Sequence, residues 1–169
     1  MTRRAAIYCR ISQDRGGAGL GVTRQEEDCR ALSARKGWDV VAFGVDRLWI
    51  DPDTGTRLPH RIVIPFRTAE GTELEQHPDT DPARIYALLS EAGHKLHWTE
   101  TASARMPLPD ERTVLQLPDA TPVLHTTRIT YGHKNTPLLL EELCVNGNRG
   151  AATYRITAEA TRQLHAVRD

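Results

Sequence analysis

The segment "TPVLHTTRITYGHKNTPLLLEELCV" (121–145) decides the fold of this 169-residue chain. Its first part (121–131) and its last part (137–145) are rich in aliphatic and β-branched residues, which favour strands. Between them lies "GHKNT", a glycine- and polar-rich stretch of the kind that joins antiparallel strands. The segment therefore predicts a β-hairpin.

Elements on both sides of the hairpin extend it into a larger sheet. Two more strands are predicted, "KLHWTETASARM" (95–106) before the hairpin and, after a second turn, "AATYRIT" (151–157) behind it. Three helices are predicted: one capped by Asp81 with Pro82 at its first position and ended by Gly93, one within 109–117, and a final amphipathic helix over 158–167. The C-terminal two-thirds is therefore predicted to be α+β, an antiparallel sheet with packed helices.

The N-terminal segment has a different pattern. Residues 4–10 predict a short strand, Thr23 can cap a helix that Gly37 ends, and a second strand begins at Trp38. Strand, helix and strand within about forty residues are typical of a βαβ-like unit. Further on, "RIVIPFR" (61–67) predicts a strand at a sheet edge, because Pro65 cannot donate a ladder hydrogen bond.

Composition excludes several classes of protein. The chain has 22 basic and 22 acidic side chains, so its overall charge does not indicate a nucleic-acid binder. No apolar run approaches the roughly 18 residues of a membrane span, so we expect a soluble protein. Three widely spaced cysteines fit reduced thiols in the cytoplasm. His94 and His97 are predicted to be surface residues and Trp98 to be in the core, so no metal site and no cofactor are expected.

The N-terminal residues "YCRIS" (8–12), with Gln25, Cys29 and "KGWDVV" (36–41), resemble the start of a large serine recombinase. The resemblance implies a nucleophilic Ser12 with Arg10 and Gln25 as phosphate-binding partners. Arg10 and Ser12 are also two positions apart on a predicted strand, which places them on one face. The later segment "DRLWI" (46–50) has an isoleucine where that family has a second arginine. We therefore expect residues 1–42 to be a recombinase-like fragment without activity.

A second resemblance covers more of the chain. The quoted segments occur in the order "SEAGHKL" (90–96), "ARMPLPDE" (104–111), "VLQLPDATPVL" (114–124), "TRITYGHKNTPLLLEEL" (127–143) and "TYRI" (153–156). They resemble the UTRA domain, the effector-binding module of HutC-type regulators in the GntR family, over about 55–169. The resemblance implies a chorismate lyase-like fold that binds a small molecule and changes the spacing of two DNA-binding domains in a dimer. We expect residues 43–79 to be a connector that begins the second domain and residues 80–169 to be the ligand-binding domain.

A ligand site follows from the hairpin. Arg128 on the first strand and Glu141 or Glu142 on the second can face each other across the turn and grip a polar ligand. Arg105 and Tyr154 could complete this pocket. The alternative is an ordinary cross-strand salt bridge worth about 0.2–1 kcal/mol. Many relatives have an Arg-x-Arg pair here, whereas this chain has Thr126 before Arg128, so a less anionic ligand is expected.

The leading hypothesis is a small-molecule sensing domain of a GntR/HutC-type transcriptional regulator, cytoplasmic and homodimeric. It would act on DNA directly or through a partner, because residues 1–80 lack a winged helix-turn-helix pattern. One alternative is a serine recombinase that cuts DNA with Ser12 and Arg10. Another is a lyase or hydrolase, which rests on fold analogy alone.

Overall fold

The computed structural model describes residues 3–11 and 19–154. Its strands are β1 (Arg4–Ile11), β2 (Asp39–Ile50), β3 (Arg57–Pro65), β4 (His97–Arg105), β5 (Val123–Tyr131) and β6 (Pro137–Asn146). Its helices are α1 (Gly19–Lys36), α2 (Phe66–Ala69), α3 (Glu73–Gln76), α4 (Pro82–Glu91), α5 (Pro109–Leu115) and the short 3-10 turn η1 (His133–Asn135). None of the described helices is long and apolar enough to cross a membrane.

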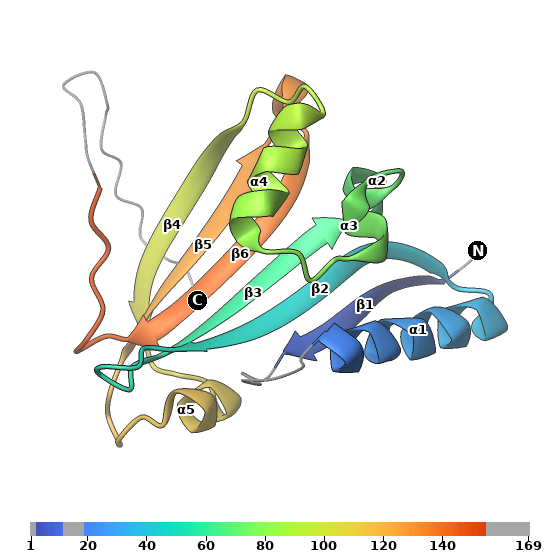
Figure 1. Ribbon diagram of the computed structural model, residues 1–169. Coiled ribbons are helices and arrows are strands. Elements are labelled where there is room, and N and C mark those ends of the chain that lie inside the picture. The colour runs from blue at the N-terminus through green and yellow to red at the C-terminus, as the bar shows by residue number, and fades with distance from the viewer. Residues whose placement is uncertain (1–2, 12–18, 155–169) are drawn as a thin grey trace.

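The described strands form one six-stranded sheet in the order β1-β2-β3-β6-β5-β4 (Figure 1). Four of its five pairings are antiparallel, and only the β1–β2 pairing, which α1 connects, is parallel. The βαβ-like start and the antiparallel sheet with packed helices are therefore both confirmed. The N-terminal βαβ-like unit and the antiparallel strands belong to one continuous sheet, because β2 pairs with β1 on one side and with β3 on the other.

The predicted hairpin is present as β5 and β6. Lys134 and Asn135 in η1 have positive φ angles of 55° and 58°, which a tight reversal of the chain requires. The predicted cap of α4 is also present, because the Asp81 side chain accepts a hydrogen bond of 2.8 Å from the Ala83 amide. Pro82 occupies the first turn, and Gly93, with φ of 85°, follows the helix.

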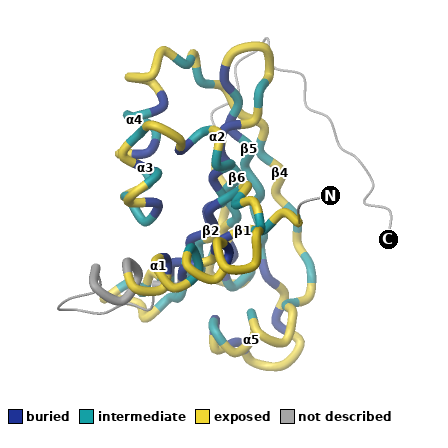
Figure 2. The backbone as a smooth tube through the Cα atoms, turned by 90° about the vertical axis from the view of Figure 1, so that its right-hand side faces the viewer, coloured by how far each residue is buried: buried dark blue, intermediate teal, exposed yellow. Residues whose placement is uncertain are grey.

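Most helices cover the same face of the sheet. Figure 2 shows α1, α3 and α4 on one side of the strands. The main core lies between these helices and the side of the sheet that they cover, the helix-covered face, and its largest sheet residues are Phe43, Ile7, Ile62, Ile64 and Leu139. We call the opposite side the open face, on which α5 packs with a smaller cluster of Leu115, Leu117, Val123 and Cys144. Alternation of side chains along each strand decides which face a residue joins.

Several predictions from the pattern are wrong. β3 is an interior strand, and Pro65 is tolerated because it is the last residue of that strand. Helix α1 begins at Gly19, so Thr23 lies inside the helix and is not its cap. Residues 151–154 are not a strand, and the remainder of that predicted strand and the predicted helix 158–167 lie outside the described residues. Trp98 is 57% exposed, because β4 is an edge strand with little packed against it.

Candidate functional site

The predicted ligand-binding residues divide between the two faces of the sheet. Arg128 and Glu141 are opposite each other in the β5–β6 ladder, as predicted, and both belong to the helix-covered face with Ile62. Glu142 is the next residue and therefore belongs to the open face, where Arg105 also lies. The structure does not bring all of the predicted residues together, because side-chain alternation puts Arg105 and Glu142 on the far side of the sheet from Arg128 and Glu141.

Glu141 is the most closely bound of the predicted residues. It is half-buried and accepts a hydrogen bond from the Tyr86 hydroxyl of α4, and its other oxygen lies 3.3 Å from Nε2 of His60 on β3. Tyr86 also lies 3.2 Å from the Thr130 hydroxyl. Burial would raise the pKa of Glu141, but the bonds with His60 and Tyr86 outweigh it, so the pKa is lowered. Glu141 is therefore a carboxylate at neutral pH.

Arg128 is paired with a residue other than the predicted one. Its Nε donates to Glu100 on β4 over 2.6 Å, and its guanidinium lies 5.8 Å from the ring centroid of the exposed Trp98. The other oxygen of Glu100 accepts a 2.7 Å bond from the Tyr154 hydroxyl. The simple Arg128–Glu141 salt bridge is therefore not formed, although Arg128 still acts electrostatically on Glu141. Tyr154 joins this group from the chain that follows β6.

Four polar side chains of this face were not predicted from the sequence: Arg47, His60, Tyr86 and Glu100. Tyr86 follows the apolar spacing of α4, so only the structure distinguishes it from a core residue. Arg47 is buried and donates a 2.8 Å hydrogen bond to the Thr80 carbonyl, while its Nη1 has no partner among the described residues. Burial lowers its pKa, opposed by Asp79, Asp81 and Glu141. Arg47 was considered only as part of a recombinase-like motif.

These residues form one polar cluster between α4 and the sheet. We call it the helix-side cluster, and its members are Arg47, His60, Tyr86, Trp98, Glu100, Arg128, Glu141 and Tyr154. Its donors and acceptors come from five strands, one helix and the chain after β6. Cations and carboxylates alternate in it, and an exposed aromatic ring lies at its edge. Such a set can bind a polar molecule through several hydrogen bonds at once.

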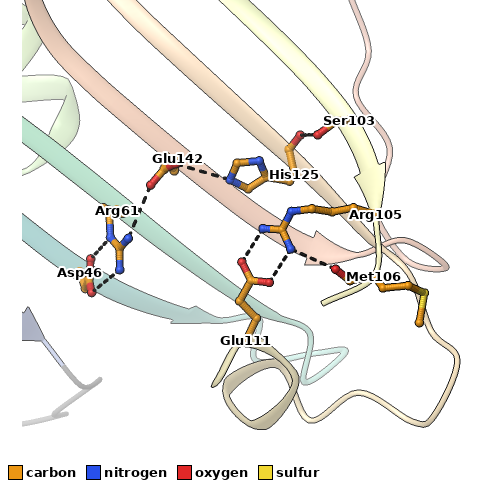
Figure 3. A network of polar contacts seen from close by, with 8 residues as sticks. All are labelled: Asp46, Arg61, Ser103, Arg105, Met106, Glu111, His125 and Glu142. Atoms are coloured by element: carbon orange, nitrogen blue, oxygen red, sulfur yellow. Dashed lines mark hydrogen bonds and ion pairs between the residues drawn. The ribbon is translucent and has the colours of Figure 1, made fainter. Parts of the chain in front are cut away.

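The open face has its own polar network (Figure 3). Arg105 makes two bonds of 2.6 Å to Glu111 of α5, which together lower the pKa of Glu111 despite its partial burial. Arg61 on β3 donates to Asp46 on β2 over 2.7 Å. Glu142 lies between these pairs, 3.7 Å from Arg61 and 3.8 Å from His125. A pocket of about 220 Å³ opens here between α5 and the sheet.

The recombinase-like pair of Arg10 and Ser12 lies largely outside the described part of the chain. Ser12 lies outside the described residues, and so does the side chain of Arg10. The Arg10 backbone pairs with Asp46 in the β1–β2 ladder. Of the described residues, none forms a group of three or more side chains that could hold a metal ion.

Three solved structures illustrate the similarity of this fold to known proteins. PhnF from Mycobacterium smegmatis has a TM-score of 0.56 at 16% identity, covering 90% of this chain and 73% of that chain. A GntR-family transcriptional regulator from Enterococcus faecalis V583 has a TM-score of 0.53 at 16% identity, covering 66% and 78%. The ligand-binding domain of a putative GntR-family regulator from Bordetella bronchiseptica has a TM-score of 0.53 at 16% identity, covering 68% and 73%. At these identities the likeness concerns the fold.

The sequence family agrees with that fold. No curated protein sequence matches this chain. The model of the UTRA domain family, however, matches residues 61–150, just over half of the chain. This range contains α4, α5 and strands β4 to β6. These elements carry most of the residues of the helix-side cluster and of the polar network on the open face. The chain therefore belongs to the UTRA domain family, the effector-sensing modules of GntR/HutC transcriptional regulators.

Proposed function

We propose that this chain senses a small polar molecule at the helix-side cluster and passes that signal to a DNA-binding partner. Arg128 and Glu141 are the central ligand-binding residues, and Tyr154 and Tyr86 close the site from the chain after β6 and from α4. The domain acts by binding and not by catalysis. We expect it to work in the cytoplasm, where a transcriptional regulator meets DNA.

One observation carries this proposal: Arg128 and Glu141 are in register on neighbouring strands, yet each is bound to a different third residue. A purely structural pair would be expected to bond directly across the strands. Here the two charges are held apart by Glu100 on one side and by Tyr86 and His60 on the other. A ligand that offers both a donor and an acceptor can bridge them.

The charges of the cluster narrow the ligand class. Two carboxylates, Glu100 and Glu141, flank Arg128 directly, and Thr126 stands where a second arginine would add positive charge. A phosphate would meet repulsion from both carboxylates. The cluster therefore suits a neutral, hydroxyl-bearing molecule or a zwitterion, whose donors would bind the carboxylates and whose acceptor would bind Arg128.

The assembly is part of the same proposal. We propose that two copies form a homodimer and that ligand binding changes how the dimer presents its DNA-binding partners. Size-exclusion chromatography with light scattering on the full chain would measure the mass of the assembly directly. A monomer at all concentrations would remove the dimer from the proposal without affecting ligand binding.

A thermal-shift screen tests the sensing role. Wild-type protein and an Arg128→Ala variant would be screened against neutral sugars, amino acids and sugar phosphates. We expect at least one neutral or zwitterionic compound to raise the melting temperature of the wild type and to lose that effect in Arg128→Ala. If no compound stabilises the wild type more than the variant, the proposed site has no support.

A further inference from the structure

The pocket on the open face lies on the opposite side of the sheet from Glu141, although Arg47 and His60 of the helix-side cluster are also among its lining residues. It has a volume of about 220 Å³ and lies between α5 and strands β2, β3, β5 and β6. That volume is below the usual 300–1,000 Å³ of a drug-sized site, so it suits a molecule of about one ring. The sheet itself lies between this pocket and Glu141, because alternate residues point to opposite faces.

Apolar side chains line much of the pocket. Leu48 comes from β2, Leu108 precedes α5 and Val114 lies within it. Cys144 on β6 is buried, and burial together with the nearby Glu111 raises the pKa of its thiol to about 11. The thiol is therefore neutral at pH 7 and behaves as a small apolar surface. A ligand here needs an apolar body.

Carboxylates outnumber the cations that point into the pocket. Asp46, Asp110, Glu111 and Glu142 line it. Arg61 lies on this face, whereas the guanidinium of Arg47 is bound to Thr80 beside the helices on the other face. Asp46 and Glu111 are each held by two bonds from an arginine, Arg61 and Arg105 respectively.

Glu142 differs from these paired carboxylates. Its contacts with Arg61 and His125 are 3.7 Å and 3.8 Å long, beyond hydrogen-bond distance, and the described residues supply none closer. Its side chain is 31% exposed, compared with 12% for the neighbouring Glu141. Figure 3 shows Glu142 between Arg61 and His125, with a dashed line from its carboxylate to each of them. This carboxylate keeps most of its hydrogen-bonding capacity for a further donor.

We propose that the open-face pocket is a second small-molecule site that takes a compact organic cation, an amidinium, guanidinium or ammonium group on an apolar body. Glu142 binds the cationic group, and an amidinium or guanidinium can do so with two parallel hydrogen bonds. Leu48, Leu108 and Val114 enclose the apolar body. Because Asp46 takes two hydrogen bonds from Arg61, the longer contact of Arg61 with Glu142 offsets only part of the attraction.

Benzamidine is a suitable probe because it combines one apolar ring with a forked cation. Its binding to the full chain would be measured by isothermal titration calorimetry, beside the neutral benzamide and the anionic benzoate. The variants are Glu142→Gln, which removes the proposed anchor, and Glu141→Gln, which removes the adjacent carboxylate on the other face. We expect millimolar or tighter binding of benzamidine, at least tenfold weaker binding to Glu142→Gln, and less than a twofold change in Glu141→Gln.

A third variant, Leu108→Trp, fills the pocket without changing its charge and should also abolish benzamidine binding. Circular dichroism would establish that each variant is folded. The proposal is overturned if benzamidine does not bind at millimolar concentration, or if benzamide or benzoate binds equally well. It is also overturned if Glu141→Gln weakens benzamidine binding as much as Glu142→Gln does, because the ligand would then lie on the helix-covered face.

Discussion

Glu141 and Glu142 are neighbours in the sequence, yet they lie in two different chemical environments. Glu141 faces α4 and the core, where Tyr86 and His60 bind its carboxylate. Glu142 faces the open side, where its nearest cationic partners are 3.7 Å and 3.8 Å away. The difference between the two carboxylates comes from their immediate partners. Tyr86 of α4 and His60 of β3 hold Glu141, whereas Glu142 keeps its hydrogen-bonding capacity even though Asp46 and Glu111 on the same face are paired with arginines.

The largest expected difference between the faces is in packing. Phe43 on β2 is 1% exposed and packs against Phe66, with ring centroids 5.7 Å apart, whereas Tyr8 on the adjacent strand is 48% exposed. Phe43→Ala should lower the free energy of unfolding by about 3–5 kcal/mol through the cavity it leaves. Tyr8→Ala should cost about 1 kcal/mol or less. Urea unfolding followed by circular dichroism would measure both.

Equal losses in these two variants would contradict the assignment of the core to the helix-covered face. A larger loss in Tyr8→Ala would place an important packing contact on the open face. Either result would show that the helix-covered face is not packed more tightly than the open face.

The two glutamates provide a smaller and more specific test. Glu141→Ala leaves the Tyr86 hydroxyl and His60 without their acceptor, which should cost about 1–3 kcal/mol of stability. Glu142→Ala removes only two long contacts and should change stability by about 0.5 kcal/mol or less. The measurement is again the free energy of unfolding in urea. Similar values for the two variants would mean that the carboxylate of Glu141 is not held as described.

The smallest expected effect is on the pH dependence of stability. The pKa of Glu141 is lowered in the folded protein, so the unfolded chain takes up the proton first as the pH falls. The ionised Glu141 therefore contributes to the free energy of unfolding above its unfolded-state pKa of about 4.3. This contribution is lost as the pH falls through its lower pKa in the folded protein. Urea midpoints measured from pH 6 to pH 3 should decline less steeply in Glu141→Gln than in the wild type. Parallel curves would show that Glu141 does not titrate with folding.

Much of the fold could be predicted because local patterns and tertiary packing agree. The β5–β6 hairpin has strand residues on both sides of a turn, and α4 has a capping Asp81 and a terminating Gly93, so each element was found within a few residues. β3 was placed at an edge because Pro65 breaks a ladder, but that residue ends the strand. A proline removes a ladder hydrogen bond only at its own position, and the sequence does not say whether that position lies within the strand or at its end.

The candidate site was harder to predict, because binding residues come together from distant segments. Arg128 and Glu141 were found because they are partners in one hairpin. Tyr86 and Arg47 reach the same cluster from α4 and β2, and no spacing in the sequence connects them to it. Arg105 was expected beside Arg128 although it lies on the other face, and Glu142 could not be separated from Glu141, since the choice between adjacent residues depends on a register that a one-residue shift reverses.

The central claim is that the helix-covered face, and not the open face, holds the sensed molecule. Isothermal titration calorimetry with the most stabilising compound from the screen would compare wild type, Arg128→Ala and Arg61→Ala, an arginine paired with Asp46 on the open face. Loss of a charged hydrogen bond costs about 1.5–3 kcal/mol, so Arg128→Ala should bind at least tenfold more weakly while Arg61→Ala changes less than twofold. Unchanged affinity in Arg128→Ala, or an equal loss in Arg61→Ala, would contradict the account.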